Sequence, residues 1–118
     1  MRVYVAHPIA HGDQFDNVRN AIHTADVLIE MGHTPFVPHL NVLWQMITGR
    51  SDIKLWLNWD TIWISQCECL IRIDRDTPSK GCDHEEKYAR EKGIPVFHSI
   101  KELEEYAIAL ENGQTELG

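Results

Sequence analysis

The chain has 118 residues, and 11 Lys and Arg against 18 Asp and Glu give it a formal net charge of −7. The length suits one domain over residues 1–118, whose core needs neither disulfides nor a structural metal. The acidic balance disfavours proteins that bind nucleic-acid polymers or anionic membranes through a general basic surface, although a few local N–H groups can still hold one phosphate.

The N-terminal residues and the cysteines bear on the cellular compartment. Met1 and Arg2 run directly into a strand-like segment, so we expect no signal peptide. No apolar run approaches the roughly 20 residues of a membrane span, and we expect a cytoplasmic protein. Cys67, Cys69 and Cys82 form no complete disulfide set and a poor zinc pattern, so we expect reduced thiols.

The first half of the chain alternates strand and helix patterns. Residues 2–6 predict a strand. Apolar residues from Phe15 to Ile29 recur at three- and four-residue steps, which predicts an amphipathic helix that ends at Gly32. Residues 35–38 predict a short strand whose flanking prolines suit a sheet edge. Residues 41–48 predict a loose helix.

The second half continues this alternation. It predicts a strong helix over residues 52–65, a central strand over 69–73, a helix over 83–92, a strand over 95–97 and a terminal helix over 99–110. Ser99 and Glu102 fit a capping box, and we expect the tail 111–118 to fray. The alternation predicts an α/β fold, with a parallel sheet of four to five strands and helices on both faces.

The strong middle helix carries an aromatic stripe with an acid beside it. Trp56, Trp59 and Trp63 recur at three- and four-residue steps, and Asp60 lies between the last two. If Asp60 is buried against indoles, desolvation raises its pKa, as expected of a proton-donating acid in a cleft. The alternative is that Asp60 points to solvent or caps a loop. The stripe favours packing against the sheet or a partner subunit over stacking on a base.

Residues 79–85 join the turn after the central strand to a helix start and place a carboxylate there. A helix start offers free N–H groups to an anion, and open α/β sheets bind ligands at the carboxyl ends of their strands. This placement predicts a small-molecule site. For Glu85 the alternative is a favourable interaction with the helix dipole, which Glu86 could make as well. For Ser79 and Gly81 the alternative is ordinary turn chemistry.

Three groups of residues together carry a resemblance to a known family. Tyr4 before Ala6-His7-Pro8, Asp60 in a middle helix, and Ser79-x-Gly81-x-x-x-Glu85 resemble the nucleoside 2-deoxyribosyltransferase superfamily. That group includes the nucleoside 5′-monophosphate N-glycosidases and short uncharacterised relatives. The resemblance extends from the first strand to Phe97. It implies a flavodoxin-like or Rossmann-like sheet and a homodimer or higher homo-oligomer whose sites lie close to subunit contacts.

The resemblance also implies a role for each matching residue. Glu85 matches the family's glutamate nucleophile, which attacks the anomeric carbon of the sugar and forms a glycosyl-enzyme. Asp60 matches the aspartate that assists departure of the base, and Tyr4 matches the tyrosine that orients the nucleophile. Ser79 and Gly81 match the loop in which the N-hydrolases hold a 5′-phosphate. Two carboxylates across a glycosidic bond can divide nucleophilic and acid/base work, as in retaining glycosidases.

The loop after the first strand departs from the family's pattern. The transferases usually have a glycine at the place of His7, and the N-hydrolases have a small, basic, Gly-rich loop. We count His7, Pro8, His11 and Gly12 among the substrate-binding candidates, with Arg19 of the first helix as a further helper. A histidine with an unperturbed pKa near 6.5 is only partly charged at neutral pH, so it clamps phosphate more weakly than arginine does.

The seven histidines raise the question of a metal site. None of them has a recognisable ligand spacing such as His-Glu-x-x-His. We therefore expect polar roles for the histidines, with no metal and no cofactor.

The sequence leaves three functions open. Our leading prediction is a hydrolase that cleaves the N-glycosidic bond of a nucleoside 5′-monophosphate through a glycosyl ester on Glu85. The second is deoxyribosyl transfer, in which a second base captures the intermediate in place of water. The third is a non-catalytic module that binds a nucleotide. The tyrosine, aspartate and glutamate argue against the third, because a binder needs no nucleophile.

Overall fold

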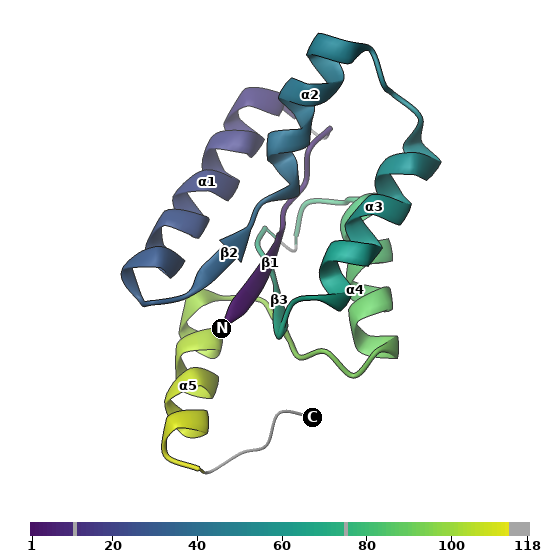
Figure 1. Cartoon of the computed structure of the whole chain (residues 1–118). Coiled ribbons are helices and arrows are strands. Elements are labelled where there is room, and N and C mark those ends of the chain that lie inside the picture. The colour runs from purple at the N-terminus through teal and green to yellow at the C-terminus, as the bar shows by residue number, and fades with distance from the viewer. Residues whose placement is uncertain (11, 75, 114–118) are drawn as a thin grey trace.

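A four-stranded parallel sheet organises the computed structural model, which describes residues 1–10, 12–74 and 76–113. Its strand order is β2-β1-β3-β4 (Figure 1). The strands are β1 (Arg2–Ala6), β2 (Thr34–Phe36), β3 (Cys69–Arg72) and β4 (Val96–Phe97). The fold is therefore the expected Rossmann-like α/β fold.

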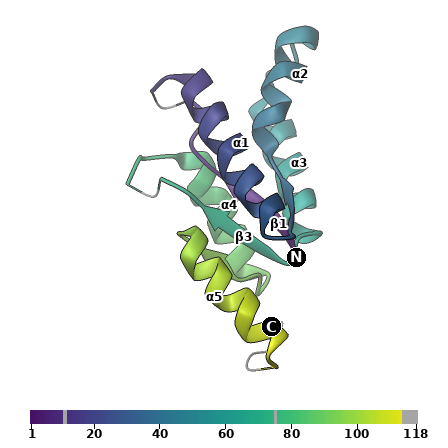
Figure 2. The ribbon, with the colours of Figure 1, turned by 90° about the vertical axis from the view of Figure 1, so that its left-hand side faces the viewer.

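Two helix layers cover the faces of this sheet (Figure 2). Val3 and Val5 of β1 pack on one face with residues of α1 (Gln14–Glu30) and α5 (Ile100–Glu111). Tyr4 and Ala6 alternate with them and pack on the other face with residues of α3 (Ile53–Ser65) and α4 (Lys80–Glu91). Since successive residues of a strand point to opposite faces, β1 contributes to both cores.

The edge strand β2 is shorter than the sequence predicted. It spans Thr34–Phe36 in place of residues 35–38, and it pairs only with β1. Pro38 begins the short 3-10 helix Pro38–Leu40 instead, because its fixed φ suits the first position of a helix. The helix α2 (Asn41–Thr48) follows at once, as predicted, and ends at Gly49, which adopts a left-handed φ of 73°.

Helix α4 begins at Lys80 rather than at residue 83, where the sequence placed it. Ser79 is its N-cap, and the Ser79 hydroxyl accepts a hydrogen bond from the Cys82 N–H at 3.1 Å. A serine cap satisfies one of the free N–H groups of the first turn, so the helix can start there. Glu85 therefore lies in the second turn, and the first-turn dipole interaction does not explain it.

The terminal helix α5 has Ser99 as its N-cap, as the capping-box pattern predicted. The Glu102 carboxylate accepts from the N–H of His98 at 3.0 Å, one residue before the cap. Of the tail expected to fray, Glu111 still belongs to α5, and residues 114–118 lie outside the described part of the chain. Among the described helices, none is long and apolar enough to cross a membrane.

The strand order places a topological switch point between β1 and β3. After β1 the chain forms β2 on one side of β1, and it then crosses to the other side of β1 to form β3 and β4. Ligands of open α/β sheets bind at such a point, beyond the carboxyl ends of the strands. The segments that follow β1, β2 and β3 all emerge at this edge.

Candidate active site

A cavity of about 570 Å³ lies at this edge of the sheet. His7 follows β1, His39 follows β2, and residues 78–82 follow β3, so three strand ends contribute to its wall. Helix α3 contributes Asp60, and helix α4 contributes Glu85. A volume of this size accommodates a small-molecule ligand.

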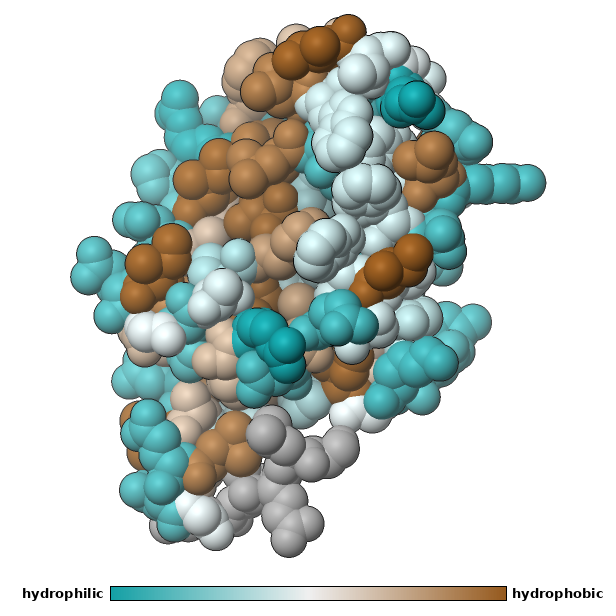
Figure 3. All heavy atoms as spheres, viewed as in Figure 1, coloured by the Kyte–Doolittle hydropathy of each residue, from teal (hydrophilic) through white to brown (hydrophobic). Residues whose placement is uncertain are grey.

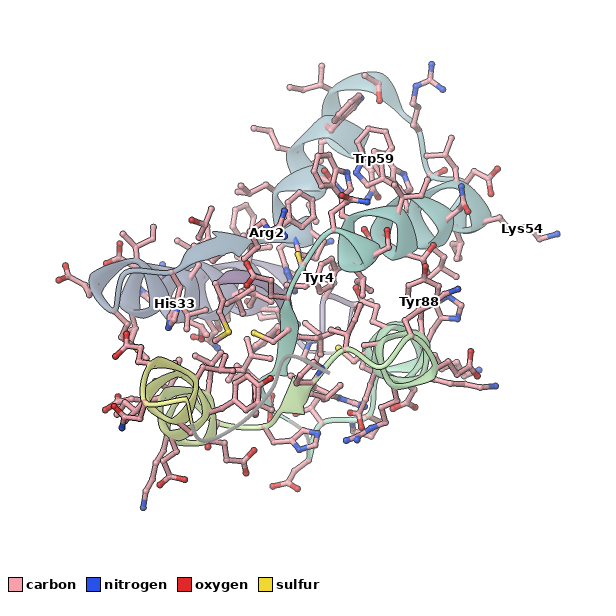
Figure 4. The ribbon with its side chains drawn as sticks, turned by 60° about the horizontal axis from the view of Figure 1, so that its bottom comes forward. Arg2, Tyr4, His33, Lys54, Trp59 and Tyr88 are labelled. Atoms are coloured by element: carbon pink, nitrogen blue, oxygen red, sulfur yellow. The ribbon has the colours of Figure 1, made fainter. Side chains whose placement is uncertain are left out.

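Glu85 is buried at the wall of this cavity, with 6% of its surface exposed. Cys82, Glu85 and Ala89 recur at three- and four-residue steps and form the buried face of α4. The hydroxyl of Tyr4 donates a short hydrogen bond to the Glu85 carboxylate. Figure 4 shows Tyr4 on the side of the sheet that α3 and α4 cover. The central strand thus fixes the orientation of a carboxylate on the adjacent helix.

Asp60 faces the same cavity from α3. Its Oδ1 atom is buried and has no hydrogen-bond partner within the described part of the chain. Burial raises the pKa of Asp60 to about 7, and the nearby Tyr4 hydroxyl opposes this rise. Asp60 therefore does not point to solvent, the alternative that the sequence left open. Its carboxyl group can exchange a proton near neutral pH.

The ionisation of the Tyr4–Glu85 pair follows from its burial. Burial raises the pKa of Glu85 to about 8, while the hydrogen bond from Tyr4 lowers it and the nearby Asp60 raises it further. Burial and the charge of Glu85 raise the pKa of Tyr4 well above its ordinary value. Tyr4 therefore remains a hydrogen-bond donor at neutral pH, and Glu85 and Asp60 titrate as a coupled pair.

Ser79, Lys80 and Gly81 line the cavity at the start of α4. A Cβ added at Gly81 would meet only the Ser79 hydroxyl, at 3.9 Å, so the packing of the protein does not itself require glycine there. The free N–H groups of this helix start lie where an anionic group of a ligand would be favoured.

The other substrate-binding candidates fall into two groups. His7 is buried and lines the cavity, and its Nδ1 lies 2.9 Å from the Pro8 carbonyl oxygen. Pro8 is buried beside it without lining the cavity. Gly12 and Arg19 are exposed and do not line the cavity, so the structure does not bring them to the site. His11 lies outside the described residues.

His39 lines the cavity as well, although it was not among the substrate-binding residues predicted from the sequence. It is 1% exposed, and its Nε2 lies 2.7 Å from the carbonyl oxygen of His7. That oxygen can only accept, so Nε2 carries the proton. Burial lowers the pKa of His39 to about 4, so its ring is neutral at pH 7. The sequence places His39 directly after an edge strand. Because the carboxyl ends of parallel strands meet at one edge of the sheet, this position indicates that His39 lies near the site.

The tryptophans do not form one continuous stripe. Trp63 stacks on Phe36 of β2, with 4.9 Å between ring centroids. Trp56 and Trp59 instead form a cluster with Trp44 of α2, and Figure 4 shows Trp59 between these two helices. Trp56 also lines the cavity, and its indole N–H donates to the Arg50 carbonyl at 2.9 Å. The cluster therefore joins α2 to α3 above the site.

The donor chemistry of the site offers little to a metal ion. Within residues 1–10, 12–74 and 76–113, no three His, Cys, Asp or Glu side chains are grouped to hold one. Burial raises the pKa of the Cys82 thiol to about 11, so it is protonated at neutral pH. The described chemistry of the site is that of two carboxyl groups and a phenol.

Comparisons with known proteins bear on the fold of the chain. A family model described as "Domain of unknown function (DUF7768)" matches residues 1–99. Among solved structures, the chain is similar to one described as "2-desoxiribosyltransferase from Leishmania mexicana", with a TM-score of 0.58 and 19% sequence identity. That match covers 80% of this chain and 61% of the other, so this chain spans less than two thirds of the transferase's length. No curated protein gives a significant match.

Proposed function

The chain belongs to the DUF7768 family, and on that premise we propose that it is an enzyme that cleaves the N-glycosidic bond of a nucleoside or nucleotide and passes the sugar to a second base. The observation that carries this proposal is the buried Tyr4–Glu85 hydrogen bond, with Asp60 facing the same cavity. A similar fold in a protein described as a 2-desoxiribosyltransferase supports it.

The first half of the reaction forms a covalent intermediate. The Glu85 carboxylate attacks the anomeric carbon, the bond from that carbon to the base nitrogen breaks, and its electron pair moves to the base. Asp60, with its pKa raised to about 7 by burial, donates a proton to the departing base. The products are a free base and a glycosyl ester on Glu85. Tyr4 holds the attacking oxygen in place through its hydrogen bond.

The second half restores the enzyme. A nitrogen of a second base attacks the anomeric carbon of the ester, Asp60 accepts a proton, and Glu85 leaves as a carboxylate. The same residues serve both halves with their proton-transfer roles reversed, as microscopic reversibility requires. A pure binding module would gain nothing from a carboxylate that burial makes costly to ionise.

A second candidate function is hydrolysis of a nucleoside 5′-monophosphate, in which water resolves the same ester. The start of α4 favours it, because Lys80 and the free N–H groups of this turn lie at the cavity and suit a phosphate. Asp83 in the same turn opposes it by its charge. The two candidates share every step up to the glycosyl ester.

We further propose that the active form is at least a homodimer. Helix α2 has no buried residue, although most of its side chains are apolar. Leu43, Met46 and Ile47 are 62%, 70% and 76% exposed, and Figure 3 shows apolar side chains gathered over this helix. Val42 and Gln45 of α2 line the cavity. A second copy seated on α2 would bury this apolar surface and cover one side of the site.

Chromatography of purified protein with nucleosides and nucleoside 5′-monophosphates, in ribo and deoxy forms, tests the proposal. Base exchange that requires an added second base supports transfer. Base release in water from monophosphates alone would support hydrolysis and set the transfer reading aside. Binding without release of base would favour the non-catalytic module.

A further inference from the structure

Arg72, the last residue of β3, is a buried cation outside the cavity. It is 7% exposed, and its guanidinium contacts two carboxylates of α4. Nη2 lies 2.8 Å from Oδ1 of Asp83, and Nη1 lies 3.2 Å from Oε1 of Glu86. A rigid planar guanidinium that contacts two groups on one helix restrains that helix more than a single flexible ion pair does.

The two carboxylates flank Glu85 in the sequence, but they lie on another face of the helix, since residues three apart, such as Asp83 and Glu86, are the ones that share a face. Asp83 precedes Glu85 by two residues, and Glu86 follows it. Glu86 is held in turn by Arg90 at 2.9 Å and by His98, before α5, at 3.2 Å. These contacts oppose rotation of α4 about its axis and sliding of α4 along β3. Either movement would carry Glu85 away from Tyr4 of β1.

We propose that Arg72 is a positioning residue of the active site, which ties the first two turns of α4 to the end of β3 and so holds Glu85 against Tyr4. The inference rests on the proposed function for its catalytic meaning. Arg72 does not line the cavity that holds Glu85 and Asp60, so it acts through α4 and through its charge.

The charge of Arg72 adds an effect that a purely structural ion pair would lack. Glu85 faces Tyr4 of β1, Asp60 of α3, Cys82 of its own helix, and Arg72 of β3. Burial raises the pKa of Glu85, and Asp60 raises it further, whereas Tyr4 and Arg72 lower it. Arg72 is the cation among these groups. It therefore counters part of the cost that burial places on the nucleophile's ionised form.

The test compares Arg72→Gln with Arg72→Lys and with Glu86→Gln. The readouts are the titration of the Glu85 carboxyl carbon by ¹³C NMR and, for any substrate found, the pH profile of kcat. In Arg72→Gln we expect the pKa of Glu85 to rise by about one unit. At pH 7, a rise of one unit in the pKa of Glu85 lowers the ionised fraction of its carboxyl group by about tenfold, and kcat should fall by the same factor. As the pH is raised, the ratio of variant to wild-type kcat should approach one, although both rates fall when Asp60 loses its proton.

The two other variants separate charge from tethering. Arg72→Lys keeps the cation but not the two-point contact, so we expect a pKa of Glu85 near that of the wild type together with a lower kcat. Glu86→Gln removes the ion pairs of Glu86 with Arg72 and Arg90 and weakens its contact with His98, and it destabilises α4 without removing the Arg72 charge. We expect Glu86→Gln to lower the melting temperature of the protein without raising the pKa of Glu85.

Two results would overturn the proposal. One is an unchanged titration of Glu85 in a folded Arg72→Gln protein. The other, which decides the matter if Arg72→Gln does not fold, is a wild-type kcat in Arg72→Lys. The NMR titration needs no turnover, so a wild-type protein that releases no base would contradict the proposed function while leaving the effect of Arg72 on Glu85 measurable.

Discussion

Tyr4 and Glu85 are separated by 81 positions in the sequence, and the hydroxyl of Tyr4 donates directly to the carboxylate of Glu85. The first strand and the fourth α-helix are joined by this contact at the switch point of the sheet. Both side chains are buried, so water competes weakly for the hydrogen bond, and its removal should have a measurable effect.

Tyr4→Phe tests the orienting role of the phenol. The ring remains to pack against Phe36, 5.7 Å away between centroids, so the fold should be retained. A hydrogen bond to a charged group contributes about 1.5–3 kcal/mol, and we expect kcat to fall by about 10- to 100-fold. Steady-state kinetics measures this loss, and the matched control is Tyr88→Phe, a partly buried tyrosine of α4 that does not line the cavity. Wild-type kcat in Tyr4→Phe would remove Tyr4 from the mechanism.

Asp60→Asn tests the acid that protonates the departing base. The amide keeps the size of the side chain but cannot donate the required proton, and we expect at least a ~100-fold loss of kcat. The mechanism needs Asp60 protonated and Glu85 ionised, and burial raises their pKa values to about 7 and about 8. The wild-type rate should therefore be greatest between these values and fall at higher pH, where Asp60 is ionised. The pH profile of the variant should lack this decline. A decline retained at the same pH would assign it to another group.

Glu85→Gln should stabilise the fold at alkaline pH. Burial raises the pKa of Glu85 from 4.5 to about 8, so the folded protein binds an extra proton between these values. The stability of the wild type is therefore full below about pH 4.5 and is partly lost as the pH rises through about 8. Thermal unfolding should show Glu85→Gln more stable than the wild type by at least about 1 kcal/mol at pH 9, with a smaller difference at pH 4.

Glu86→Gln is the matched control for that measurement, with the opposite sign. Burial opposes ionisation of Glu86, but hydrogen bonds from His98, Arg90 and Arg72 lower its pKa to about 2. Its stabilising contribution is therefore present above pH 4.5 and is lost as the pH falls toward 2. The control should be less stable than the wild type at pH 9. If Glu85→Gln and Glu86→Gln were both less stable than the wild type at pH 9, ionisation of Glu85 would not be costly to the fold, and this prediction would be wrong.

Ile47→Glu tests the proposed dimer. Ile47 is 76% exposed on α2, and a charge there should make burial of this surface unfavourable. We expect light scattering after size exclusion to give a dimer for the wild type and a monomer for Ile47→Glu at micromolar concentration. Ile108→Glu, on the separate helix α5, should remain a dimer. A monomeric wild type would contradict the proposal.

The sequence predicted the helices and strands well where one local pattern dominates. The helix with periodic apolar residues from Phe15 to Ile29 and the capped helix after Ser99 both appear in the structure. It placed the start of α4 three residues too late, since residues 80–83 (Lys-Gly-Cys-Asp) are too short and mixed to show an apolar pattern and the Ser79 cap decides the boundary. Boundaries that depend on one side-chain hydrogen bond leave little trace in hydrophobic periodicity.

The candidate site was less predictable than the fold. Burial of Asp60 and Glu85 depends on how α3 and α4 pack on the sheet, which local spacing does not determine. The sequence left Asp60 open between solvent and cleft for this reason, and it gave no sign of the contact between Arg72 and α4. The role of His39 also follows from tertiary structure, because its partner is a backbone carbonyl of a distant loop.

The most direct test of the account follows base release by wild type and Glu85→Gln, side by side, from a panel of nucleosides and nucleoside 5′-monophosphates with and without an added base. We predict that the folded wild type releases base from at least one member and that Glu85→Gln, which keeps the shape of the side chain but cannot form the glycosyl ester, releases none. Equal release by both proteins, or none by the folded wild type across the panel, would contradict glycosyl transfer through Glu85.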